Sequence, residues 1–258
     1  MRIKSLFVFA VVVAIGVIAA SPQAQAGVIS VNFNCPPPDS DSKSFVTGTA
    51  GVIAAGNWTN TNANFTSLTL TDLKNDLGIG TTADLTATHA SGGWASVGGE
   101  HSTEDAHIVK TYVDTFGATT TFTITSIPYT LGYDLYYYHD GGATASNKGI
   151  KVTVNGTDYY SHEYATNFPI NGTADAFVEY HDTSESAAQA SDGGHYMHLK
   201  GLSGDLTILV TAPTTSGWDS SVPRAPTNGF QIVEVPEPAT MALMALGGLG
   251  LLLKRRRR

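Results

Sequence analysis

The sequence predicts an all-β protein: a single antiparallel β-sandwich, jelly-roll-like, preceded by a signal peptide and followed by a short C-terminal transmembrane helix. Three observations support this prediction. Apolar and polar residues alternate with period two in many short stretches, glycine-rich turn signals separate these stretches, and each end of the chain carries an apolar segment next to basic residues. The apolar fraction of 42% is sufficient for a buried core.

The first 26 residues have the layout of a secretory signal peptide. Arg2 and Lys4 form a basic start, residues 6–20 are apolar, and Ala24-Gln25-Ala26 supplies small residues for cleavage by signal peptidase. Cleavage there makes Gly27 the first residue of the mature chain. A retained N-terminal membrane anchor is the alternative, and both interpretations place the rest of the chain outside the cytoplasm.

The clearest strand signal is a hairpin within residues 27–233, which we expect to form one domain. Ile150, Val152 and Val154 are apolar at every second position, and Asn155-Gly156 supplies the residues that a type I′ turn requires. Single sandwiches of about 200 residues are ordinary. No repeat of about 20–50 residues indicates a solenoid or a propeller.

Further strands are predicted at residues 65–71, 121–125, 133–138, 157–160, 176–180, 196–200, 206–211 and 230–235. Thr, Tyr, Val and Ile dominate these stretches, as is typical of strands. One short helix is predicted at residues 103–113, with Thr103 as its N-cap and Ile108, Val109 and Tyr112 on its apolar side.

The C-terminal tail, residues 234–258, combines a proline-rich turn, an apolar segment and a basic end. A helix over residues 239–253 would be ~22 Å long, shorter than the ~30 Å hydrocarbon core of a bilayer, so it is a marginal anchor. The basic end should stay in the cytoplasm and leave the turn at the outer face of the membrane. Its residues are Lys254, Arg255, Arg256, Arg257 and Arg258.

The order of Val235-Pro236-Glu237-Pro238-Ala239-Thr240, a glycine-containing apolar stretch and an arginine run resembles the PEP-CTERM sorting tail of Gram-negative bacteria. The resemblance implies that Pro236, Glu237 and Pro238 are the motif recognised by an exosortase. It also implies transient anchoring in the inner membrane, removal of the tail, and delivery to the cell surface or extracellular polysaccharide matrix. A plain membrane anchor with a chance Pro-Glu-Pro turn is the alternative.

A second resemblance concerns the body of the chain. Residues 51–60, the tyrosine-rich stretch at 133–138 and the closing stretch at 228–233 are similar to galactose-binding-like sandwiches, which often precede such tails. This resemblance implies a jelly roll without identifying a ligand.

The charge distribution argues against nucleic acid as a partner. Seven of the 14 basic residues lie in the two terminal segments, whereas all 22 acidic residues lie between Asp39 and Glu237, so the chain without those terminal bases carries a net charge of −15. Such a surface repels a phosphate backbone.

The single cysteine, Cys35, excludes an intramolecular disulfide.

No motif predicts a catalytic residue or a cofactor. The chain lacks the serine-hydrolase elbow, the phosphate loop and the zinc motif His-Glu-x-x-His. The eight histidines have no diagnostic spacing for a transition metal: His89, His101, His107, His139, His162, His181, His195 and His198. A structural calcium site at Asp39-Ser40-Asp41 or at Asp72 and Asp76 stays open, with no ligands assigned.

Three functions are compatible with these observations. We favour a non-enzymatic, exported surface or matrix protein. The first alternative is a carbohydrate-binding module for exopolysaccharide or plant or algal polysaccharide, in which Trp58, Trp94 and Trp218 would stack on sugar rings from polar loops. The second is a secreted hydrolase, because two carboxylates among 22 acidic residues would suffice for glycoside hydrolysis.

Overall fold

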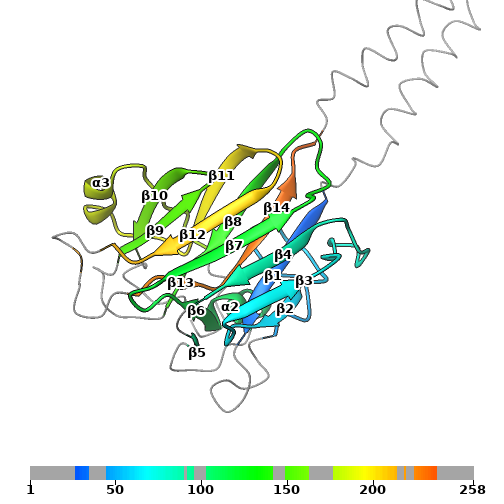
Figure 1. Cartoon of the computed structure of the whole chain (residues 1–258), viewed down its shortest axis with the longest axis horizontal. Helices are drawn as coiled ribbons and strands as arrows, with labels where there is room; N and C mark the ends of the chain where they lie inside the picture. Colours follow the sequence, from blue (N-terminus) through cyan, green and yellow to red (C-terminus); the bar gives the residue numbers. More distant parts are fainter. Residues whose placement is uncertain are drawn as a thin grey trace, which may run out of the picture. The chain divides into compact units, whose positions relative to one another are not determined.

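Strands dominate the computed structural model, which describes residues 27–34, 45–89, 92–95, 103–141, 149–162, 177–213, 218 and 224–236. By their contacts, residues Gly27–Val235 form one unit, separate from residues 1–26 and 236–258. The described strands of this unit form a five-stranded, a six-stranded and a three-stranded sheet (Figure 1). The chain is therefore mostly β, as the sequence predicts.

The five-stranded sheet contains the first and last of these strands side by side. Its order is β11 (Tyr196–Leu202), β8 (Tyr133–Tyr138), β14 (Gly229–Glu234), β1 (Val28–Asn34) and β2 (Thr59–Asn62). β14 lies antiparallel to both of its neighbours, with Val28 opposite Val233 and Glu234 opposite Tyr133.

The six-stranded sheet is antiparallel throughout its described pairs. Its order is β10 (Thr157–His162), β9 (Gly149–Val154), β12 (Leu206–Thr211), β7 (Thr119–Thr125), β4 (Asp84–Thr88) and β3 (Ser67–Leu70). A smaller sheet joins β13 (Pro226–Thr227), β6 (Thr111–Asp114) and β5 (Gly92–Ala95). The described helices are α2 (Glu104–Lys110) and α3 (Glu185–Gln189).

The two larger sheets share one hydrophobic core. β7 alternates buried and partly exposed side chains along its length, and the buried set includes Phe122 and Ile124. Phe33 of β1 and Phe230 of β14 come from the other sheet, and the ring centroids of Phe33 and Phe122 are 5.1 Å apart. Burying each such side chain stabilises the fold by about 1.5–3 kcal/mol, so this shared layer holds the two sheets together.

Local sequence signals predict several elements correctly. β8 and β12 have the predicted bounds, and the predicted hairpin joins β9 to β10 with Val154 opposite Thr157. Asn155 and Gly156 have φ angles of 47° and 87°, as a type I′ turn requires. Thr103 caps α2, because its side chain accepts a hydrogen bond from the N–H of Ala106 at 3.2 Å.

Three local predictions need correction. The helix ends at Lys110, because residues 111–114 pair with β5 as strand β6 instead of continuing it. The strand predicted at 176–180 is absent from the described residues 177–180, where Glu179 forms only an isolated bridge with Tyr196. β1 and β2 pair in parallel, so the sheet is not wholly antiparallel; the long connection between them allows this geometry.

Gly229 provides a test of the β1–β14 pairing. A Cβ atom at this position would overlap the carbonyl oxygen of Val31. This oxygen belongs to the backbone, so it cannot rotate away as the end of a side chain can. We expect Gly229→Ala to lower the free energy of unfolding by about 1–3 kcal/mol, measured by chemical denaturation. Gly56→Ala is the matched control, because its nearest neighbour would be 3.8 Å away. Equal stability of the two variants would contradict the pairing.

Candidate functional site

The chain leaves the five-stranded sheet at the end of β14. The N–H of Glu234 donates to the carbonyl oxygen of Gly27 at 2.9 Å, and the N–H of Val235 donates to the carbonyl oxygen of Gly132 at 3.1 Å. Pro236 follows and is exposed. Because proline has no N–H, it cannot continue the ladder. The predicted recognition residues therefore begin where the hydrogen bonding of the sheet stops.

Comparison with known proteins identifies this part of the chain. Residues 234–258 match the PEP-CTERM protein-sorting motif. The match confirms the identity that the sequence indicates for the tail, and it places exposed Pro236 inside the sorting motif. No curated protein and no solved structure matches the chain.

Most of the sorting motif lies outside the described residues. This applies to Glu237 and Pro238, to the predicted transmembrane helix and to the basic end from Lys254 to Arg258, and also to the predicted signal peptide. Within the described ranges, neither helix has the length and apolar character that a membrane crossing requires.

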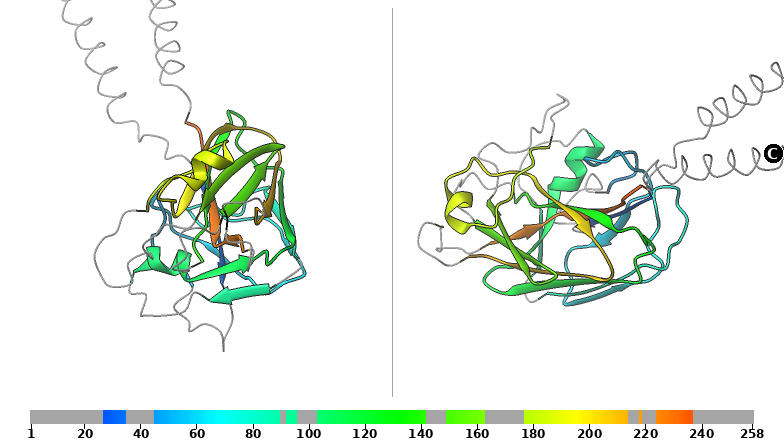
Figure 2. Two further views of the ribbon diagram at one scale, coloured as in Figure 1. Left: turned by 90° about the vertical axis from the view of Figure 1, so that its left-hand side faces the viewer. Right: turned by 90° about the horizontal axis from the view of Figure 1, so that it is seen from above.

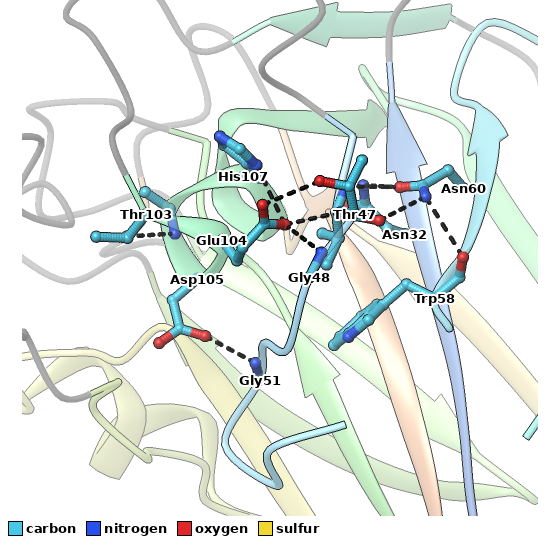
Figure 3. Close-up of polar contacts among 12 residues, drawn as sticks. Asn32, Thr47, Gly48, Gly51, Trp58, Asn60, Thr103, Glu104, Asp105 and His107 are labelled. Atoms are coloured by element: carbon cyan, nitrogen blue, oxygen red, sulfur yellow. Dashed lines mark hydrogen bonds and ion pairs between the residues drawn. The ribbon is translucent and has the colours of Figure 1, made fainter. Parts of the chain in front are cut away.

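Two carboxylates at the start of α2, those of Glu104 and Asp105, bind the segment that runs from residue 45 to β2 (Figure 3). Glu104 Oε2 accepts hydrogen bonds from the N–H groups of Thr47 and Gly48, at 2.7 and 2.9 Å. Partial burial would raise the pKa of the Glu104 carboxyl, but these hydrogen bonds outweigh it and hold the pKa below its usual value. Asp105 Oδ1 accepts from the N–H of Gly51 at 2.7 Å. The first turn of α2 thus holds this segment by backbone contacts, which is a structural role.

The aromatic residues predicted to bind sugar are packed inside the fold where their side chains are described. Trp58 and Trp218 are each 6% exposed. The Nε1–H of Trp58 donates to the carbonyl oxygen of Ala55, and its ring packs 6.2 Å from that of Tyr138. The indole of Trp218 lies against the backbone of Gly149 and donates to Glu185 at 2.7 Å.

Stacking on a sugar needs an open ring face, so the positions of Trp58 and Trp218 do not favour that role. For Trp94 the structure describes only the backbone, opposite Tyr112 in the smaller sheet. The proposed sugar-binding function therefore stays a prediction, without support from the described geometry.

A group of buried histidines lies just after β8, at the end of β10 and just before β11. The N–H of His139 donates to the carbonyl oxygen of His195 at 2.9 Å, and the His139 ring stacks on Tyr137. His139 is fully buried, and neither of its ring nitrogens forms a hydrogen bond. His195 Nδ1 accepts from the N–H of Val178 at 2.9 Å, so its proton belongs on Nε2, which lies 4.0 Å from Asp140. His162 Nε2 lies 2.9 Å from the carbonyl oxygen of Ser191.

The imidazoles of His139 and His195 are neutral at physiological pH. Burial, together with the nearby His195 and His162, lowers the pKa of His139 to about 3. Burial lowers the pKa of His195 to about 4. Within the described ranges, no three His, Cys, Asp or Glu side chains are placed to hold a metal ion, and Asp39 and Asp41 lie outside those ranges.

The histidine group predicts a loss of stability in mild acid. Unfolded imidazoles take up protons below about pH 6.5, whereas His139 and His195 in the folded chain do so only near their lowered pKa values, so the free energy of unfolding falls as the pH drops from 6.5 to about 4. We expect a loss of about 1–2 kcal/mol per histidine at pH 5, measured by denaturation across this range.

His139→Phe should make this pH dependence shallower, because it removes one of the two groups. Phe177→Leu is the control, since its ring centroid lies 6.5 Å from that of His195 and its side chain has no titratable group. An unchanged slope in His139→Phe would contradict the assignment.

Proposed function

We propose that the chain is an exported, non-enzymatic protein that an exosortase recognises through Pro236, Glu237 and Pro238. Residues 234–258 anchor it transiently in the inner membrane. Removal of the apolar and basic residues that follow the motif then releases it to the cell surface or the extracellular matrix. The observation that carries the proposal is the match of residues 234–258 to the sorting motif.

The end of the β unit supports this role for the tail. β14 ends at Glu234, and Val235 still donates to Gly132, so only exposed Pro236 separates the sheet from Glu237. An enzyme that binds this motif has to approach the end of the β unit closely. The basic residues at 254–258 favour the cytoplasmic side of the membrane, which leaves the motif on the outer side.

For the β unit we propose a jelly-roll-like sandwich of the galactose-binding-like type, with no catalytic role. Two observations support it: the two larger sheets enclose one core, and the first strand pairs with the last. The acidic character of the chain between its ends makes nucleic acid an unfavourable partner. The unit would then serve at the surface as a folded, soluble module.

Removing the tail and altering the motif separate sorting from simple anchoring. A chain that lacks residues 236–258 should move from the cell envelope to the periplasm or medium, measured by fractionation and immunoblotting of the producing bacterium. A chain with Pro236→Ala, Glu237→Gln and Pro238→Ala should keep its tail and stay in the inner membrane. Thr240→Ser is the control for changes near the motif.

Each outcome has a definite meaning. Unchanged surface retention of the truncated chain would contradict sorting by the tail. Normal processing of the triple variant would contradict recognition through Pro236, Glu237 and Pro238. Retention of the tail by the wild-type chain as well would show that residues 236–258 act as a plain anchor, which is the alternative that the sequence leaves open.

A further inference from the structure

The first residue after the predicted cleavage site lies against the last residue of β14. The N–H of Gly27 donates to Glu234 Oε2 at 3.3 Å, and the carbonyl oxygen of Gly27 accepts from the N–H of Glu234 at 2.9 Å. Both the side chain and the backbone of Glu234 thus contact Gly27. The two residues are 207 positions apart in the sequence.

A second carboxylate lies next to this contact. Asp76 Oδ1 accepts a hydrogen bond from the N–H of Val28 at 3.2 Å, and an isolated bridge joins Asn75 to Ile29. The loop between β3 and β4 is therefore fixed against the start of β1. The views of the β unit show this loop, the start of β1 and the end of β14 at the same end of the sheets (Figure 2).

The third group is a buried hydroxyl without a hydrogen bond. Tyr129 is 8% exposed, and its Oη forms no hydrogen bond. A Cβ atom on Gly27 would lie 3.1 Å from this Oη, so the hydroxyl is directed at Gly27. Burial, followed by the carboxylates of Glu234 and Asp76, raises the pKa of Tyr129 and keeps it a neutral phenol.

We propose that Glu234, Asp76 and Tyr129 form a binding site for the α-ammonium group of Gly27. In the uncleaved chain, Gly27 offers this site one neutral amide N–H. Hydrolysis of the Ala26–Gly27 bond adds the hydroxide of water to the carbonyl of Ala26 and its proton to the nitrogen of Gly27. The amine then takes up one more proton and becomes a cation with three N–H donors, which suits two carboxylates and a phenol oxygen.

The site also accounts for glycine at position 27. A Cβ atom there would approach both Tyr129 Cε1 and Tyr129 Oη to 3.1 Å and Glu234 Oε2 to 3.5 Å. Any larger first residue would crowd the groups that bind the amine.

This inference rests on the export step of the proposed function and extends it. Removal of the signal peptide would convert a neutral hydrogen bond into an ion pair between the start of β1 and the end of β14. That ion pair lies two residues before Pro236. Processing at the N-terminus would thereby strengthen the strand end from which the sorting sequence departs.

The test measures proton binding by the amine itself. The signal-processed protein is purified from the exporting bacterium, and its first residue is determined by N-terminal sequencing. The α-amine is then labelled by reductive methylation at a series of pH values, and the extent is read by mass spectrometry. An ordinary α-amino group has a pKa of about 7.7–8.0. We expect the Gly27 amine to bind its proton about three- to tenfold more tightly than that.

Variants assign the effect to the site. Glu234→Gln should remove the larger part of the increase in proton affinity, because only Asp76 is then left as a carboxylate, and Tyr129→Phe should lower the affinity by a smaller factor because it removes only an uncharged acceptor. Glu179→Gln is the control, since Glu179 bonds to Tyr196 and not to residues around Gly27. If a variant fails to fold, the proton affinity of the Gly27 amine in the wild-type protein still tests whether the site exists.

Failure of the amine site can be distinguished from failure of the predicted cleavage position. A mature chain that begins at another residue overturns the site together with the predicted cleavage position. A chain that begins at Gly27 but has an amine of ordinary proton affinity overturns the site and leaves export and sorting intact.

Discussion

The antiparallel pairing of β1 with β14 is the contact on which the rest of the unit depends. It sets Ile29 opposite Ile232 and Val31 opposite Phe230, so both strands place apolar side chains in the core shared by the two sheets. Because the partners come from opposite ends of the unit, their pairing closes a long stretch of chain and has to offset the conformational entropy lost in doing so. The pairing also brings Gly27 and the residue before Pro236 to the same end of the unit.

This geometry relates the two processing events that the sequence indicates. Signal peptidase would act just before Gly27, and an exosortase would recognise the motif that begins just after Val235, so both enzymes would work at the same end of the β1–β14 pair. Buried polar contacts hold that pair: the carboxamide of Gln231 contacts Ser30 on β1, and Gln231 Oε1 accepts from the hydroxyl of Tyr138 at 2.6 Å. The two ends of the β unit thus lie together, at the end of the β1–β14 pair where Glu234 bonds to Gly27.

The sequence predicts the features that short-range chemistry determines. Asn155-Gly156 specifies a turn and Thr103 a helix cap because each acts within a few residues, and the sorting tail is recognisable from contiguous residues. β1 is missing from the predicted strands, although Ile29, Val31 and Phe33 alternate with polar residues. The burial of its polar face depends on residues brought from far along the chain, and so does the contact between His139 and His195. The burial of Trp58 could not be predicted for the same reason, because the residues next to it in the sequence are polar and the side chains that cover it come from elsewhere in the chain.

Export of a folded β unit, followed by removal of its sorting tail, relates the two ends of this chain to its β-sheets. Intact-mass measurement of the protein recovered from the cell surface tests it most directly. We expect a chain that begins at Gly27 and has lost the apolar and basic residues that follow Pro236-Glu237-Pro238. A full-length chain of 258 residues, uncut at both ends and located in the cytosol, would contradict it.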